Sequence, residues 1–152
     1  CMPCGTRTIQ YPLGKIVRMK RTELPVEITR LTLHDKYEGI VEFKTSSGNI
    51  YEAFFWGKSY KVGEKVFVEL HHQSLPLDWK KTFSLNPNKE KKLEKLSGEC
   101  EYAGYGEIEQ IDPIIACFGD IKLDLGNWTR DKKIIGEFIY WRINRLEIAL
   151  ET

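Results

Sequence analysis

The chain lacks long apolar runs and a strong net charge. Lys and Glu interrupt every hydrophobic stretch of its 152 residues, so none is long enough to span a bilayer. No secretory signal with an apolar centre is visible. A net charge of +1 argues against a protein that mainly neutralises a phosphate backbone, because such domains are usually clearly basic. With 41% hydrophobic and 30% charged residues, the composition is that of a globular protein.

Cysteine is scarce for a chain of this length. The four cysteines, Cys1, Cys4, Cys100 and Cys117, do not form a dense disulfide framework, which predicts a reducing, cytoplasmic location. Cys1 allows an alternative interpretation, in which the chain is a processed bacterial lipoprotein anchored to a membrane through an acylated cysteine. Cys1 and Cys4 also have the spacing of half a zinc ribbon, but a closed site needs four ligands and no second pair follows. They are the metal-ligand candidates of this sequence.

Catalytic and cofactor motifs are absent as well. The sequence contains no P-loop, no GxGxxG and no GxSxG elbow, so we expect no cofactor and assign no catalytic residues. His71 and His72 are neighbours on an expected strand and therefore point to opposite faces, which prevents both from binding one ion. The sequence favours a non-enzymatic protein, and a small hydrolase using His71 or His72 stays as an alternative.

Apolar residues at every second position are the main pattern in the sequence, and this pattern is typical of β-strands. The stretch 25–35 carries apolar residues at Val26 and Ile28 and then at Leu31 and Leu33, a change of parity that predicts a β-bulge near residues 29–30. The stretch 137–150 changes parity in the same way near residues 144–145. Its run of aromatic and β-branched residues favours a strand over a terminal helix.

Further strands and one helix complete the expected fold. Strands are predicted at 39–45 and 50–56, joined as a hairpin, and at 65–72, 104–111, 114–118 and 120–125. A short surface helix is predicted at 88–96. The fold class is therefore mostly β, an antiparallel small barrel of bent strands, either OB-like or made of two fused β meanders, with one short surface helix.

The domain organisation follows from the same pattern. Residues 1–14 hold two prolines and two glycines and are expected to form an irregular N-terminal arm. Residues 15–152 form a single β domain, which can also be divided into two meanders, 24–74 and 100–150, joined by 75–99. A weak internal echo supports that division, because Gly48-Asn49-Ile50 and Val62-Gly63-Glu64 correspond to Gly119-Asp120-Ile121 and Ile135-Gly136-Glu137.

Aromatic residues suggest one binding function. Tyr51, Phe55 and Phe67 could form a platform on which the bases of single-stranded nucleic acid stack. The basic residues that could follow the backbone are Lys15, Arg18, Lys20 and Arg21. An OB-like nucleic-acid-binding module is therefore the alternative function.

Charge segregation suggests the main functional hypothesis. From residue 99 to 124 the chain has seven acidic residues and one lysine. An acidic face of this kind suits a basic protein partner, because complementary charge speeds encounter and rejects wrong partners. The expected contacts are Glu99, Glu101, Glu107, Glu109 and Asp112.

The C-terminal third also carries a resemblance. Its pattern consists of Gly106-Glu107-Ile108, Cys117-Phe118-Gly119-Asp120-Ile121, Ile135-Gly136-Glu137-Phe138-Ile139 and Arg145-Leu146-Glu147-Ile148. It resembles the ends of small bacterial β proteins, some of which are similar to immunity proteins that neutralise a toxin. The resemblance implies a toxin or nuclease as the basic partner and identifies no functional residue.

Overall fold

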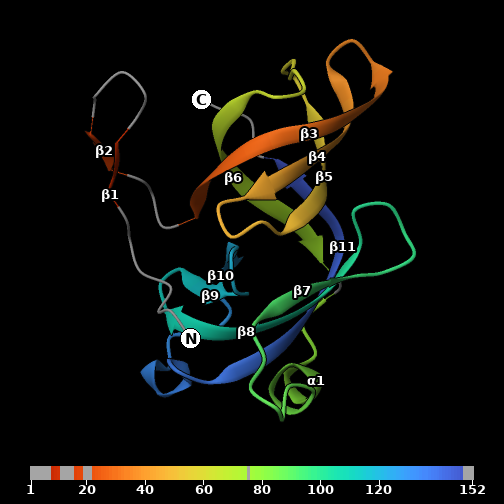
Figure 1. Cartoon of the computed structure of the whole chain (residues 1–152). Coiled ribbons are helices and arrows are strands. Elements are labelled where there is room, and N and C mark those ends of the chain that lie inside the picture. Colours follow the sequence, from red (N-terminus) through yellow and green to blue (C-terminus); the bar gives the residue numbers. More distant parts are fainter. Residues whose placement is uncertain (1–7, 11–15, 19–21, 75, 149–152) are drawn as a thin grey trace.

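A computed structural model of the chain describes residues 8–10, 16–18, 22–74 and 76–148 (Figure 1). The side chains of 8–10 and 16–18 are not described. Among the described residues no helix is long and apolar enough to cross a membrane. The candidate ligands Cys1 and Cys4 lie outside the described residues, as does much of the expected N-terminal arm.

The described part of the chain is mostly antiparallel β-structure with one short α-helix, as the sequence predicts. A small separate hairpin consists of β1 (Thr8–Gln10) and β2 (Ile16–Arg18). All other strands belong to one sheet: β3 (Glu23–Asp35), β4 (Glu38–Thr45), β5 (Ile50–Trp56), β6 (Lys65–Ser74), β7 (Lys92–Lys95), β8 (Tyr102–Gln110), β9 (Ile114–Cys117), β10 (Lys122–Gly126) and β11 (Phe138–Ile148). The helix α1 is Trp79–Ser84, and a 3-10 turn, η1, is Lys132–Ile134.

Five of these strands close into a ring in the order β3, β4, β5, β11, β6. The pair β5 and β11 is parallel, and the other neighbours are antiparallel. This order is that of an OB-like fold, whose last strand here follows a long insertion carrying α1 and β7 to β10. The ring surrounds an apolar core in which Ile28, Phe43 and Leu70 are fully buried.

The longest strands bend where the sequence predicts. The register of β3 against β4 shifts between Ile28 and Arg30, and that of β11 against β6 shifts between Ile143 and Arg145. Both predicted bulges are therefore confirmed, and so is the strand at the C-terminal end. The second bulge divides β11 into a first half that pairs with β8 and a second half that pairs with β6.

Eight of the nine strands of the sheet form two Greek keys with the same connectivity, and β7 lies outside both. In each, three strands form a meander and the fourth returns beside the first, which gives the orders β6-β3-β4-β5 and β11-β8-β9-β10. Each first strand bulges after a buried isoleucine, Ile28 in one and Ile108 in the other.

The turns that return the fourth strands match in detail. The backbone N–H of Gly63 donates to the carbonyl of Ile28 at 2.7 Å, and that of Gly136 donates to the carbonyl of Ile108 at 2.8 Å. Both glycines have a φ near +90°, a conformation that favours glycine. The internal echo in the sequence thus corresponds to two structurally equivalent turns.

The helix lies elsewhere than the sequence predicts. Residues 88–96 do not form a helix, because Lys92–Lys95 pairs with β8 as β7. The apolar pair at Leu93 and Leu96 fits a helix, but only Leu93 is buried, and its neighbours alternate outward as in a strand. The ladder with β8 therefore outweighs the local helical pattern, and the helix forms at Trp79–Ser84 instead.

Candidate functional site

The helix α1 begins with a side-chain cap and leaves large apolar residues exposed. The carboxylate of Asp78 accepts a hydrogen bond from the backbone N–H of Lys81 at 3.2 Å, which fixes the first turn. Trp79 is 49% exposed, and Leu77 and Leu85 on either side of the helix are 39% and 46% exposed. The helix and its two flanking segments thus present three large apolar side chains to solvent. Exposed apolar patches commonly mark interaction sites.

An aromatic cluster connects this surface to the core. The ring of Trp79 contacts Phe83 at 5.1 Å and the edge of Trp128 at 5.2 Å between centroids. Trp128, which follows β10, stacks on Trp141 of β11 at 6.0 Å with an interplanar angle of 19°. Trp141 is buried and donates from Nε1 to the Oγ of Ser74 at 3.0 Å. Because the innermost ring is held in the sheet, the outer rings have a rigid base.

A buried amide holds the segment after α1 in place. The Nδ2 of Asn86 donates to the carbonyls of Glu90 and Ile139, at 3.0 and 3.1 Å. Its Oδ1 accepts from the backbone N–H of Glu90 at 2.8 Å. These three bonds use both the donor and the acceptor groups of the amide. The bond to Ile139 attaches the segment to β11. The orientation of α1 is therefore fixed by a contact outside the helix as well as by its own six residues.

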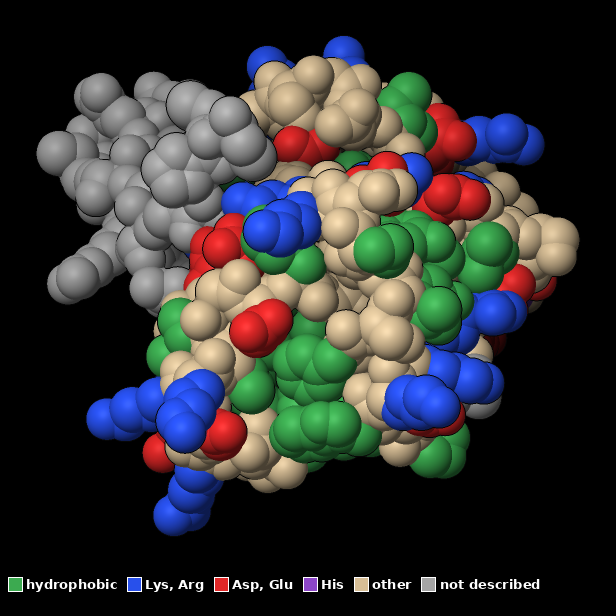
Figure 2. Space-filling model, turned by 90° about the horizontal axis from the view of Figure 1, so that it is seen from below, with side chains coloured by type: hydrophobic (Ala, Val, Ile, Leu, Met, Phe, Trp, Pro, Cys, Tyr) green, Lys and Arg blue, Asp and Glu red, His purple; other side chains and the backbone are tan. Residues whose placement is uncertain are grey.

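Cations lie next to the aromatic cluster in the sequence. Exposed basic side chains that form no ion pair with any described residue flank Trp79 and Trp128 in the sequence: Lys80, Lys81, Arg130, Lys132 and Lys133. The nearby acids are engaged, because Asp78 caps α1 and Asp131 caps η1 through the backbone N–H of Lys133 at 3.0 Å. Figure 2 looks at the end of the molecule that carries α1 and shows hydrophobic side chains with Lys and Arg on both sides. We call the residues 77–85 and 128–133 the basic aromatic face.

One polar atom in this face has no partner. The Nε1 of Trp128 is buried and makes no hydrogen bond with any described residue. A buried unpaired donor costs about 1–3 kcal/mol, so native structures hold few of them. The sequence gives little hint of this face, since Trp79 and Trp128 are far apart in the chain and only the folded sheet brings them together.

The predicted acidic contacts are mostly engaged inside the protein. Glu101 accepts from Arg142 at 2.6 Å, Glu107 pairs with Lys91 at 3.0 Å and Glu109 pairs with Lys122 at 3.1 Å. The hydrogen bond from Arg142 is the largest cause that lowers the pKa of Glu101. Glu99 and Asp112 are exposed and form no ion pair with any described residue. Three of the five predicted contacts are therefore paired with cations inside the protein, and two remain exposed.

The two candidate histidines have different surroundings. His71 is exposed, 3.8 Å from Glu69. His72 faces inward, where its Nε2 lies 3.0 Å from the carbonyl of Asp124 and its Nδ1 lies 2.6 Å from the Oγ of Ser74. A carbonyl only accepts, so Nε2 carries the proton and Nδ1 accepts from Ser74. Burial is the largest cause that lowers the pKa of His72. The Nε2 bond thus joins β6 to β10, and the Nδ1 bond lies within β6.

The predicted stacking platform is placed wrongly. Tyr51 and Phe55 are buried in the core, so they cannot receive bases, whereas Phe67 is half-buried on β6. The side chains of Lys15, Arg18, Lys20 and Arg21 lie outside the described part. The aromatic residues on the outer side of β5 are Phe54 and Trp56, 5.7 Å apart, with the guanidinium of Arg145 4.2 Å from the ring of Phe54. Because Tyr51, Ala53 and Phe55 face inward along β5, the residues available on its outer side are the ones between them.

Metal binding finds no support in the described part of the chain, where no group of three or more His, Cys, Asp or Glu residues could hold an ion. Cys100 is buried and free, and burial is the largest cause that raises its pKa to about 12, so it stays protonated at neutral pH.

Comparison with protein-family models, curated proteins and solved structures gives no match. The fold and the basic aromatic face therefore stand on the chain's own geometry.

Proposed function

We propose that this chain is a non-enzymatic binding protein that docks an acidic protein partner on its basic aromatic face. The observation that carries the proposal is the exposed Trp79, which is supported by a rigid stack of rings. Five cations without ion-pair partners among the described residues lie close to Trp79 or Trp128 in the sequence. Trp and Arg dominate the binding energy of protein interfaces, and complementary charge orients the partner.

The aliphatic residues favour a protein over a nucleic acid. Leu77 and Leu85 offer no flat ring for a base to stack on, but they fit apolar side chains of a protein. The class of function is the one that the sequence predicts, a protein-recognition module. The proposed face and the charge of the partner differ, because Glu101, Glu107 and Glu109 already have internal cation partners.

A peptide-display selection from a random library tests this proposal. We expect the selected peptides to combine Asp or Glu with large apolar residues. Their binding should fall on Trp79→Ala and on the double change Lys132→Glu with Lys133→Glu. The matched controls are Tyr37→Ala, which is as exposed as Trp79 but lies in the β3–β4 turn, and Lys65→Glu on β6.

Three outcomes would overturn the proposal. They are peptides rich in Lys and Arg, peptides insensitive to the changes at 79, 132 and 133, and no selected peptides at all. Tight binding of oligo-dT that is lost on Trp79→Ala would instead assign the face to nucleic acid.

The outer side of β5 supports a second candidate, the nucleic-acid-binding module. Phe54 and Trp56 form an outward aromatic pair with Arg145 beside it, on the surface that OB folds use for oligonucleotides. Glu42 and Glu52 lie on the same side of the ring, which weakens attraction for phosphate. Oligo-dT binding that is lost on Trp56→Ala and kept on Trp79→Ala would favour this function.

A further inference from the structure

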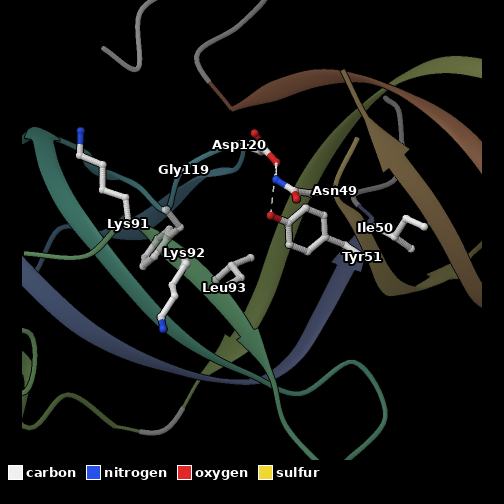
Figure 3. A pocket seen from close by; sticks show the side chains of 9 residues that line it. Asn49, Ile50, Tyr51, Lys91, Lys92, Leu93, Gly119 and Asp120 are labelled. Atoms are coloured by element: carbon white, nitrogen blue, oxygen red, sulfur yellow. Dashed lines mark hydrogen bonds between the residues drawn. The ribbon is translucent and has the colours of Figure 1, made fainter. Parts of the chain in front are cut away.

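A pocket of about 290 Å³ lies where the equivalent turns of the two Greek keys meet (Figure 3). The β4–β5 turn supplies one wall, the β9–β10 turn another, and the strand β7 the third. The residues that line it are Asn49, Ile50, Tyr51, Lys91, Lys92, Leu93, Phe118, Gly119 and Asp120. Its size suits one side chain or one small molecule rather than a nucleotide.

The two lysines of the wall do not supply positive charge to the interior. The Nζ of Lys91 pairs with Glu107 at 3.0 Å, and that of Lys92 lies 3.4 Å from both Glu90 and Glu94. Figure 3 shows both amino groups directed away from Asp120. What these residues present to the pocket is therefore mainly their alkyl chains, as long cationic side chains commonly do.

Asp120 supplies a negative charge that no described cation balances. Its carboxylate accepts hydrogen bonds from four neutral side chains: Thr45 at 3.1 Å, Ser47 at 2.6 Å, Asn49 at 2.6 Å and Tyr51 at 3.4 Å. Burial acts to raise the pKa of Asp120, but these bonds outweigh it and hold the pKa below its ordinary value. The group is thus ionised at neutral pH and lies at a pocket without a counterion among the described residues.

The two carboxylate oxygens are not equally occupied. Oδ2 accepts from Thr45, Asn49 and Tyr51, whereas among the described residues Oδ1 accepts only from Ser47. A carboxylate oxygen offers two lone pairs, so Oδ1 retains room for one further donor and Oδ2 does not. A guanidinium binds best through two parallel bonds to both oxygens, which the crowding at Oδ2 prevents. A primary ammonium needs only one oxygen.

We propose that this pocket is a binding site for a primary alkylammonium group, which donates one hydrogen bond to Oδ1 of Asp120. The alkyl stem would lie against Leu93, Phe118 and the methylene groups of Lys92. The site is separate from the basic aromatic face, and it does not depend on the function proposed above. The ligand chemistry is shared by a lysine side chain of another protein and by a free aliphatic diamine.

A titration followed by backbone and side-chain amide NMR tests the site directly. Pentylammonium is expected to shift the signals of Asn49, Leu93 and Gly119. Pentylguanidinium should bind with an affinity at least about threefold lower, and pentanol should not bind. Asp120→Asn should weaken pentylammonium binding by about tenfold or more, the loss expected for one hydrogen bond to a charged group. Glu99→Gln, which changes an exposed carboxylate outside the pocket, is the matched control.

A second variant keeps the test decisive if Asp120→Asn does not fold. Lys92→Gln removes a surface cation at the pocket and should strengthen pentylammonium binding by about twofold. Absence of binding by the wild-type protein, equal binding of the guanidinium, or the same affinity in Asp120→Asn would overturn the proposal.

Two ligands then distinguish the sources of the ammonium group. Binding of Nα-acetyl-lysine methylamide at least as tight as that of 1,5-diaminopentane supports the site and assigns it to lysine side chains of a protein. Binding of the diamine alone supports the site and assigns it to small amines.

Discussion

Asn49 and Asp120 occupy the same position in the two Greek keys, and the Nδ2 of Asn49 donates to the Oδ2 of Asp120 at 2.6 Å. Each residue follows a glycine with a φ near +92°, Gly48 in one turn and Gly119 in the other. The two copies of one turn are therefore bonded to each other, with an amide in one copy and a carboxylate in the other. This contact joins the five-stranded ring to the inserted strands at their turns.

Replacing Asp120 by Ala should destabilise the protein by about 1–3 kcal/mol, because partly buried donors lose their shared acceptor. The pKa of Asp120 is lower in the folded protein, so its contribution is complete above the unfolded pKa of about 3.9 and is lost as the pH falls through the folded value. The free energy of unfolding, measured with urea from pH 7 to pH 2, should fall less steeply with decreasing pH in the variant than in the wild type. Identical slopes would contradict this role, and Glu99→Ala is the control.

Replacing Trp141 by Ala should cost about 3–5 kcal/mol, the range for a buried aromatic residue. The side chain is 8% exposed, supports the ring of Trp128 and bonds to Ser74. Trp79→Ala, at the exposed end of the same cluster, should cost about 1 kcal/mol. Denaturant melts of the two variants compare them, and an equal cost would mean that the cluster is not anchored at its inner end.

His72 should make stability depend on pH near neutrality. Its pKa is lower in the folded protein than the unfolded value of about 6.5, so the unfolded state takes up a proton first as the pH falls. Stability should therefore decline below about pH 6.5 until the folded pKa is reached. His72→Gln should remove this decline, and the exposed His71→Gln should keep it. Urea midpoints at pH 7.5, 6.5 and 5.5 measure the difference.

The equivalent glycines Gly63 and Gly136 should respond alike to substitution. Each has a φ near +90°, and a methyl group added at either position meets no atom within 4 Å. Ala should therefore cost only the backbone strain, about 1–2 kcal/mol at each site. Unfolding free energies of the two variants give the comparison. A cost at one position and none at the other would argue against the equivalence of the two turns.

Charge reversal at Glu109 should damage the fold. Its side chain and that of Lys122 are 14% and 10% exposed and lie 3.1 Å apart. Glu109→Lys places two ammonium groups together in a mostly buried site, for which we expect a loss of about 3–5 kcal/mol. Glu99→Lys at an exposed position is the control. If Glu109→Lys melts like the wild type, Glu109 is available to a partner after all.

The strands were predictable because their signals are local. Alternation and the two parity changes gave the strands and located both bulges, at Ile28–Arg30 and Ile143–Arg145. A change of parity requires an extra residue in the ladder, whatever the strand pairs with. The helix was misplaced because 88–96 has only two apolar residues at helical spacing, and pairing with β8 decides its conformation.

The candidate sites were less predictable because they depend on contacts between distant segments. Nothing near Glu107 or Glu109 in the sequence shows that Lys91 and Lys122 neutralise them. The proximity of Trp79 and Trp128, and that of Asn49 and Asp120, follows only from the closure of the sheet. Sequence alternation also could not decide which side of β5 faces inward, since both sides carry aromatic residues.

The position of β11 constrains how the chain is made. This strand follows every other described strand in sequence, yet it pairs with β5, β6 and β8. During synthesis, β5 and β6 therefore leave the ribosome well before β11, the strand that pairs with their edges, has been made. Such unpaired edges invite pairing with other chains. We therefore expect the nascent chain to be most prone to aggregation before β11 is synthesised.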